Sequence, residues 1–234
     1  MRLKINQLDL LKTMRIPKHN HLISLLVITL SLTFCISGCT TVYYSAWEKL
    51  GKHKRDLLRD NVEAAKEEQK EAREQFKTVL ERIKELQNFD GGKLEKVYNA
   101  LKEDYDDAVD QAEDIKNRIE KVEDISTDLF EEWQKEIDII SNQKMKSDSS
   151  KKLRVTKQKY SELHRSLKKT ETRMDAVLVR FNDHVLYLKH NLNAVAIGGL
   201  ETETINIEKE INKLISEMQT SISEADKFIK TLPQ

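Results

Sequence analysis

The feature that most constrains the fold is a run of helical heptads with no helix breaker inside it. The chain has two prolines, Pro17 and Pro233, and both lie outside this run. Within it, apolar residues recur at alternating steps of three and four, whereas a strand would alternate every second residue. Such a repeat places the apolar side chains of each helix on one seam and predicts a left-handed supercoil with neighbouring helices.

Four separate segments carry this heptad spacing. The first, with one polar member, consists of Leu58, Val62, Ala65, Gln69, Ala72, Phe76, Val79, Ile83 and Leu86. The second consists of Leu94, Tyr98, Leu101, Tyr105, Ala108, Ala112, Ile115, Ile119, Val122, Ser126, Leu129, Trp133, Glu136 and Ile140. The third, which slips near its seventh member, consists of Leu153, Tyr160, Leu163, Leu167, Met174, Val177, Phe181, Val185, Leu188 and Leu192. The fourth consists of Leu200, Thr204, Ile207, Ile211, Leu214, Met218, Ser221, Ala225, Phe228 and Leu232.

Three interruptions separate these segments. The stretch 88–92, Asn-Phe-Asp-Gly-Gly, is a turn signal, because glycine takes the left-handed backbone angles that end a helix. The stretch 146–150, Lys-Ser-Asp-Ser-Ser, offers N-cap residues for a new helix. The pair Gly198-Gly199 is a weaker signal, because a helix can continue through two glycines at a cost of about 1 kcal/mol each.

Helix lengths decide between three helices and four. At about 1.5 Å per residue, the helices predicted near 44–88, 93–142 and 149–195 span roughly 65, 75 and 70 Å. One rod through both final segments would reach about 120 Å and leave an apolar stripe uncovered. We therefore predict an all-α fold, an elongated antiparallel coiled-coil-like bundle of three long helices and a shorter C-terminal helix. The bundle forms a single domain over residues 46–232.

The first 38 residues have the pattern of a secretory signal. A basic stretch ends at Lys18, and an uncharged, largely apolar run extends from His21 to Phe34. This run is too short for a membrane-spanning helix, which needs about 20 apolar residues, but it suits the apolar core of a signal peptide. Met14 is an alternative start that would give a signal of more usual length.

The four residues that end at Cys39, Ile-Ser-Gly-Cys, resemble the lipobox of bacterial lipoproteins. In that motif an aliphatic residue and two small residues precede the cysteine that is acylated and becomes the new N-terminus. The alternative is an ordinary secreted protein with an incidental cysteine. We expect removal of residues 1–38, lipidation of Cys39 and a linker over 39–45. By the same resemblance, Thr40 after the cysteine favours the outer membrane, with the protein facing the periplasm.

Charge argues against a nucleic-acid partner. The chain has 40 basic and 40 acidic residues, but residues 1–38 hold five basic residues and a single acidic one. The rest of the chain therefore has a net charge of about −4 and shows no basic stripe, whereas neutralising phosphates needs clustered Lys and Arg. We expect the acyl groups to bind the membrane, and an envelope protein or the cell wall to be the partner. The oligomeric state stays open.

No catalytic or metal-binding motif is evident in the sequence. The chain after the predicted cleavage site has four histidines, His53, His164, His184 and His190. None lies in a His-Glu-x-x-His or Glu-x-x-His motif. The acidic run 103–114 is either a divalent-cation site or, more simply, a solvated helix face. We therefore expect a non-enzymatic protein with no catalytic residues, no metal and no cofactor.

The segment 185–194 combines an aromatic residue, a base, an imidazole and two amides just before a predicted turn. In an antiparallel bundle it lies at the same end as the 88–92 turn. It is either a binding patch or a polar network that caps the helix. The candidate partner-binding residues of this tip are Phe89, Asp90, Tyr187, Lys189, His190, Asn191 and Asn193.

Three stretches resemble DUF2959, a family of bacterial lipoproteins. The first is Gly38-Cys39 followed by Tyr-Tyr-x-Ala-Trp-Glu-Lys-x-Gly from residue 43. The others are Asn-Phe-Asp-Gly-Gly-x-Leu-Glu over 88–95 and Tyr-Leu-Lys-His-Asn-Leu-Asn-Ala over 187–194. The resemblance implies a lipoprotein from a Gram-negative bacterium. It implies no activity and no catalytic residues.

Two functions fit these observations. We expect a cell-envelope lipoprotein that acts as a non-enzymatic structural, scaffolding or spacer protein. The alternative is a regulatory or stress-sensing module that engages a ligand or an envelope partner through its distal tip.

Overall fold

The computed structural model describes residues 44, 52–87, 94–191 and 201–232. The chain divides into two compact units, Met1–His53 and Lys54–Gln234, and the second unit contains the long helices. The predicted signal segment 1–38, Cys39 and most of the linker 39–45 lie outside the described residues.

The described residues of the second unit form four helices: α3 (Lys54–Gln87), α4 (Leu94–Ile139), α5 (Gln143–His190) and α6 (Glu201–Ile229). No strand occurs among the described residues, so the prediction of an all-α fold is confirmed. The shortest helix is α6 with 29 residues, and the longest is α5 with 48. The separation of α5 from α6 confirms four helices rather than one continuous rod through the last two segments.

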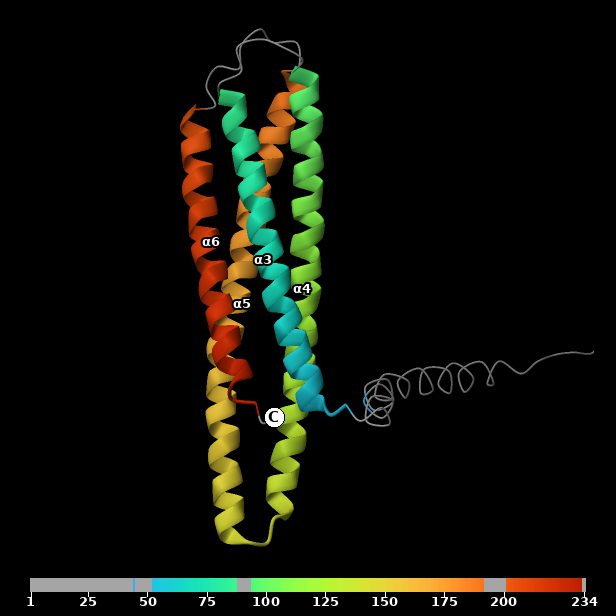
Figure 1. Cartoon of the computed structure of the whole chain (residues 1–234), viewed down its shortest axis with the longest axis vertical. Helices are drawn as coiled ribbons and strands as arrows, with labels where there is room; N and C mark the ends of the chain where they lie inside the picture. The colour runs from blue at the N-terminus through green and yellow to red at the C-terminus, as the bar shows by residue number, and fades with distance from the viewer. Residues whose placement is uncertain (1–43, 45–51, 88–93, 192–200, 233–234) are drawn as a thin grey trace, which may run out of the picture. The chain divides into compact units, whose positions relative to one another are not determined.

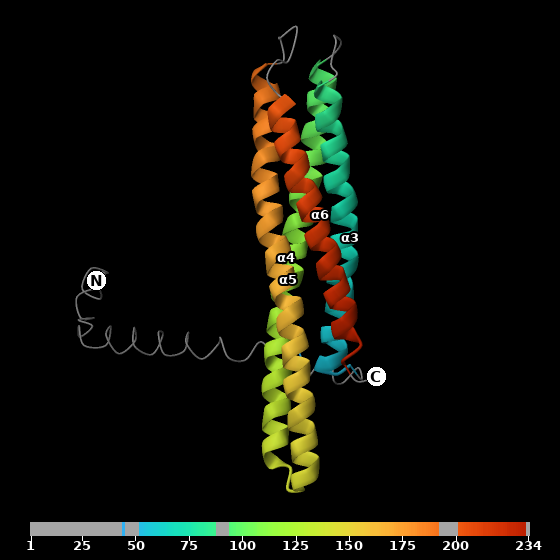
Figure 2. The same cartoon turned by 90° about the vertical axis from the view of Figure 1, so that its left-hand side faces the viewer.

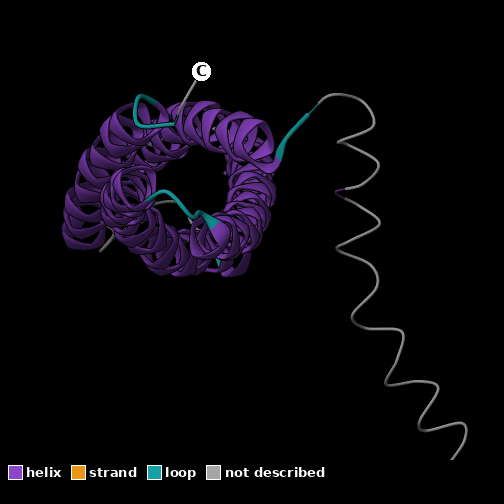
Figure 3. Cartoon of the chain, turned by 90° about the horizontal axis from the view of Figure 1, so that it is seen from below, coloured by secondary structure: helices purple, strands orange, loops and turns teal. Residues whose placement is uncertain are grey.

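The helices run antiparallel and lie side by side (Figures 1 and 2). α3 packs against α4 and α6, and α5 packs against the same two helices. Seen along their length, they form a ring around a common core (Figure 3). Across this core, the rings of Phe76 on α3 and Phe181 on α5 lie with their centroids 5.8 Å apart. Two of the largest core side chains thus join the two helices that are diagonal in the ring.

The heptad seams form this core. Every seam residue of α3 from Leu58 to Ile83 is buried, including the polar Gln69. On α5 the slip in the heptad spacing turns two adjacent residues, His184 and Val185, toward the interior. Fully burying an aliphatic or aromatic side chain contributes roughly 1.5–3 kcal/mol, so the seams are the main source of stability.

Two helix starts differ from the prediction. α3 begins at Lys54 rather than near residue 44, because Lys52 and His53 are not helical. Gly51 directly before them is a weak helix former, which favours a break at this point. α5 begins near 143 rather than 149, because Asn142 is its N-cap and accepts a hydrogen bond from the Met145 backbone N–H at 3.1 Å. Asparagine caps a helix as well as serine does, so the serines of 146–150 lie inside α5.

The last turns of α4 depart from their predicted seam. Phe130 and Ile137 are buried there, whereas Glu136 and Ile140 of the predicted seam are not. The change begins near the level at which α3 starts and α6 ends, since Lys54 still contacts Glu132 and Phe228 still contacts Tyr160. Further along, α4 packs against α5 alone. A small separate core forms between the two helices, and it comprises Phe130, Ile137 and Leu153 with Leu129, Trp133 and Tyr160 packed against them.

The two ends of the bundle are therefore different. At the tip end, α3 and α5 finish while α4 and α6 begin. At the hairpin end, α4 and α5 continue past the start of α3 and the finish of α6 (Figures 1 and 2). Lys54 Nζ lies 2.6 Å from Glu132 Oε2, which marks the level at which α3 starts. The turns of α4 after Glu132 extend roughly 10 Å further, at 1.5 Å per residue.

Polar contacts between helices fix their register. Arg118 of α4 donates to Glu68 Oε1 of α3 at 2.8 and 3.0 Å, and to Asn61 Oδ1 at 3.0 Å. The other helix pairs have similar contacts, which join Lys66 to Asp226, His164 to Glu123, and Arg173 to Glu217. Partly exposed pairs contribute only about 0–1 kcal/mol each, so their main effect is on which residues face each other.

Three polar side chains interrupt the apolar core in its middle part. They are Gln69 of α3, Thr170 of α5 and Ser221 of α6, and each is at most 1% exposed. One side-chain oxygen of each has no hydrogen-bond partner among the described residues. A buried oxygen without a partner costs about 1–3 kcal/mol, so these residues lower the stability of the bundle.

Replacing Thr170 with valine is expected to stabilise the protein. Valine has nearly the same shape and removes the buried hydroxyl, which should raise the free energy of unfolding by about 1 kcal/mol in urea denaturation. Thr172→Val on the same helix is the control, because its exposed hydroxyl already donates to Lys168 O at 3.0 Å. A loss of stability in the Thr170 variant would show that this hydroxyl has a partner.

Candidate functional site

Of the predicted tip residues, those that the structure describes lie at the tip end of the bundle. Tyr187, Lys189 and His190 belong to the last turn of α5 and have exposed side chains. Three of the predicted residues lie outside the described ranges: Phe89, Asp90 and Asn193. The predicted patch is therefore described only on its α5 side.

Asn191 caps α5. Its backbone N–H donates to Leu188 O at 2.9 Å, and its side-chain Nδ2 donates to Tyr187 O at 2.7 Å. Both bonds satisfy carbonyl groups that the end of a helix leaves without partners. For Asn191 the capping alternative is therefore confirmed. The exposed side chains of Lys189 and His190 remain as the candidates for binding.

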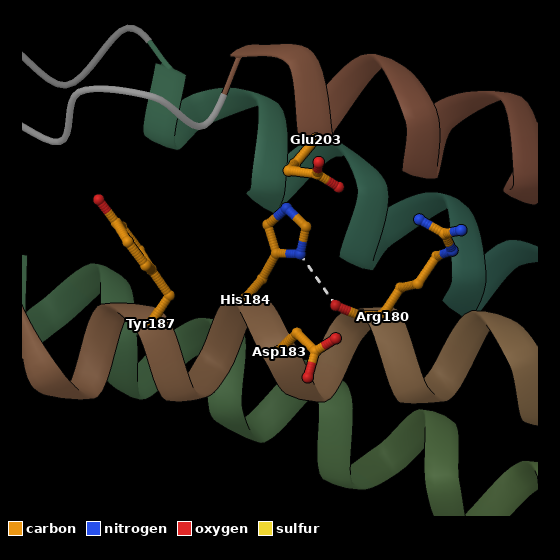
Figure 4. A pocket seen from close by; sticks show the side chains of 5 residues that line it. All are labelled: Arg180, Asp183, His184, Tyr187 and Glu203. Carbon is orange, nitrogen blue, oxygen red and sulfur yellow. Dashed lines mark hydrogen bonds between the residues drawn. The ribbon is translucent and has the colours of Figure 1, made fainter.

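Next to these residues, a pocket of about 280 Å³ lies between α5 and α6 (Figure 4). It is lined by Arg180, Asp183, His184 and Tyr187 of α5 and by Glu203 of α6. Figure 4 shows the imidazole of His184 directed from α5 toward Glu203, with Arg180 and Tyr187 on either side along the same helix. The pocket thus extends the predicted tip down the α5–α6 interface.

His184 is the buried group of this pocket, and it is only 6% exposed. Its Nδ1 lies 2.9 Å from Arg180 O, and because a carbonyl can only accept, Nδ1 carries the proton of this bond. The other nitrogen, Nε2, is buried and has no hydrogen-bond partner among the described residues. In the neutral ring, Nε2 is therefore an unused acceptor inside the pocket.

The charged groups around His184 also have no ion-pair partner among the described residues. Arg180, Asp183 and Glu203 form no ion pair within the described part of the chain, and all three are exposed. A small ligand with a hydroxyl or amine could donate to Nε2 while its charge faces a carboxylate or the guanidinium. In the described ranges, no group of three or more His, Cys, Asp or Glu is placed to hold a metal ion.

Sequence reasoning did not select His184. The histidine lies off the third seam, and the usual meaning of such a position is an exposed side chain. The signal that could have identified it is the slip near Phe181, because two successive steps of four turn an extra position inward. That extra position is His184.

The first half of α5 carries a second cluster of charged groups. Residues 144–169 contain ten Lys and Arg residues, and their only acidic residues are Asp148 and Glu162. The prediction that the chain has no basic stripe is therefore wrong for this helix. The acidic residues of α4 balance the sum over the whole chain and conceal the local excess.

An open groove of about 620 Å³ lies beside this basic segment at the hairpin end. Its lining residues are Trp133, Asp148, Lys151, Lys152, Val155, Thr156 and Thr231. The indole Nε1 of Trp133 donates to Ser149 Oγ at 3.0 Å, which holds the ring between α4 and α5. At the same end, burial raises the pKa of Tyr160, whose ring contacts that of Phe228 with centroids 5.8 Å apart.

Comparison with known proteins identifies the family. Residues 43–232 match the family described as protein of unknown function DUF2959, and this range contains all four helices. The chain belongs to the DUF2959 family. The match confirms the resemblance seen in the sequence. No curated protein and no solved structure matches the chain.

In this DUF2959 protein, the matched range includes both the His184 pocket and the hairpin end. Neither feature therefore comes from an extension outside the family's own sequence. Among the described helices, none is long and apolar enough to cross a membrane.

The geometry predicts which nitrogen of His184 carries the proton. At pH 8.5, where histidines are ordinarily neutral, two-dimensional ¹H–¹⁵N NMR should show the Nδ1–H form for His184. His190 is exposed and serves as the control, with the Nε2–H form expected to dominate. A His184→Gln variant assigns the signal. An Nε2–H form of His184 would mean that the bond to Arg180 O is absent.

Proposed function

We propose that this protein is a lipid-anchored cell-envelope lipoprotein that acts as a non-enzymatic spacer or scaffold. The observation that carries the proposal is one core shared by four long helices, of which α5 alone has 48 residues. At about 1.5 Å per residue, such a helix spans roughly 70 Å. A narrow, stiff bundle of this length is suited to holding two points apart.

The direction of the chain supports an anchor at the hairpin end. α3 begins at that end, so the polypeptide that follows Cys39 enters the bundle there. An acylated Cys39 would then hold this end near a membrane and leave the tip end free for an envelope protein or the cell wall. The features behind this part of the proposal are the signal-like segment 1–38, the lipobox-like residues before Cys39, and Thr40, which favours the outer membrane.

The register contacts support a mechanical role. Arg118 with Glu68, Lys66 with Asp226, and Arg173 with Glu217 cross three of the four helix interfaces. The contacts of Arg118 and Lys66 oppose sliding of α3 along its neighbours by a heptad, which apolar seams alone allow at a low cost. A spacer that bears load along its axis needs this resistance.

A second candidate function is a binding module that senses a ligand or stress through its tip. The observation that favours it is His184, whose buried Nε2 has no partner in the described part of the chain and faces a pocket. The exposed Lys189 and His190 lie close to that pocket along α5. A ligand there would contact α5 and α6 together and would stabilise their packing.

Lipidation can be tested at the cysteine itself. Cys39→Ala should abolish labelling with a radioactive or clickable fatty acid and release the protein from the membrane fraction. Cys35→Ala is the matched control and should change neither result, because the lipobox-like spacing belongs to Cys39. Unchanged labelling and fractionation of the Cys39 variant would contradict the lipoprotein proposal.

The choice between a docking tip and a plain spacer can be tested by photo-crosslinking in cells. A photoreactive residue at His190 probes the tip, and one at Lys121, which is exposed in the middle of α4, is the control. We expect a discrete adduct from position 190 and none from position 121, identified by mass spectrometry. Equal labelling at both positions would mean that the tip is not a specific contact.

A further inference from the structure

We propose that the hairpin end is a second membrane contact that docks onto anionic phospholipid headgroups. It comprises the last turns of α4 and the first turns of α5, where cations without an ion-pair partner in the described ranges lie beside exposed aliphatic side chains. Its place in the cell rests on the proposed lipid anchor, but the lipid binding itself does not require Cys39.

The apolar part of this surface is exposed without a covering element. Ile139 is 82% exposed, Met145 is 62% exposed and Val155 is 44% exposed. Ile139 and Met145 flank the turn between α4 and α5, which is the outermost point of the hairpin. Side chains of this kind can enter the boundary between headgroups and acyl chains of a bilayer.

The basic part lies on the same turns. Lys144, Lys151, Lys152 and Arg154 are exposed, and none has an ion-pair partner within the described residues. This differs from the charges in the body of the bundle, many of which pair with a neighbouring helix. Lysine also opposes the dipole at a helix N-terminus, and the first turn of α5 contains no acidic residue. Folding alone therefore does not explain these cations.

The combination favours a lipid surface over other occupants. A nucleic acid would use the cations but would gain nothing from Ile139 and Met145. A second copy would need a large complementary apolar area, whereas three scattered side chains offer little. An anionic bilayer uses both components, because lysines reach the phosphates while aliphatic groups sink below them.

The position of the hairpin agrees with this occupant. It projects beyond the start of α3 and the finish of α6, so the other helices do not shield it from a flat surface. The chain between Cys39 and Lys54 can span at most about 50 Å when fully extended, which keeps the hairpin within reach of the membrane that holds the acyl groups. A lipid anchor and a polybasic patch together give stable attachment where one weak signal does not.

The test uses residues 54–234, which contain the four helices and their own core and lack both cysteines and the predicted anchor. Sedimentation with phosphatidylglycerol vesicles should show binding that weakens with salt, and phosphatidylcholine vesicles should bind far less. Each lysine near an anionic surface adds about fivefold in affinity, so changing Lys144, Lys151 and Lys152 to Glu should lower binding by about a hundredfold.

The matched control changes three exposed lysines elsewhere, Lys116, Lys121 and Lys213, to Glu. Its net charge equals that of the hairpin variant. If the hairpin end is a specific site, this control should lose much less binding than the hairpin variant. Circular dichroism verifies that both variants are folded. If a variant is unfolded, the same lysines are changed to glutamine instead.

A second readout locates the contact. Met145→Cys introduces the only thiol in residues 54–234, and an environment-sensitive fluorophore there should shift to the blue with phosphatidylglycerol vesicles. The same label at Lys121→Cys should not shift. Equal binding to both lipids, equal loss in both triple variants, or a dimer in ultracentrifugation that buries position 145 would overturn the proposal. None of these results depends on Cys39, so they stand whether or not lipidation is found.

Discussion

The structure depends on burying four apolar seams against one another. Each seam is a narrow stripe, so each helix needs neighbours on two sides, and a closed ring of four supplies them. The ring cannot extend where α3 and α6 stop, and from there α4 and α5 cover each other with a smaller core that includes Ile137 and Leu153. Two helices cannot enclose all their apolar side chains, which is why Ile139 and Met145 remain exposed at the hairpin end.

Apolar seams fix the fold but fix the register only weakly. Leu, Ile and Val recur at similar positions in successive heptads, so a helix displaced by seven residues would still bury its seam. Polar contacts reduce this ambiguity: Asn61 and Glu68 lie seven residues apart, so a displaced Arg118 would keep only one of the two. Arg173 contacts both Glu210 and Glu217, but Glu203 and Glu224 continue the same seven-residue spacing, so these contacts fix which face of α6 meets α5 rather than one heptad register.

Periodicity in the sequence was sufficient to predict the fold and the end of the bundle at which the tip residues lie. It reports which side of a helix is buried, and the α3 seam is buried as predicted from Leu58 to Ile83. It does not report how many neighbours a helix has, so the seam of α4 was wrong beyond Ser126, as α4 approaches the level at which α3 begins and α6 ends. It also overlooked His184, because a slip in spacing changes the inward face within one turn. The basic segment of α5 was missed because a sum over the chain hides opposite local excesses.

The features that lower the stability of this protein lie in two places, the middle of the core and the two ends, and their positions indicate different roles. Gln69, Thr170 and Ser221 lie in the middle of the core, where a polar member of a seam can disfavour alternative registers. The buried Nε2 of His184 and the lysines of α5 that have no ion-pair partner among the described residues lie toward opposite ends of the bundle. Neither helps the bundle to fold, and each faces solvent or a pocket. The same rod therefore presents two chemically different ends, which is what a spacer requires if it must hold a membrane at one end and a partner at the other.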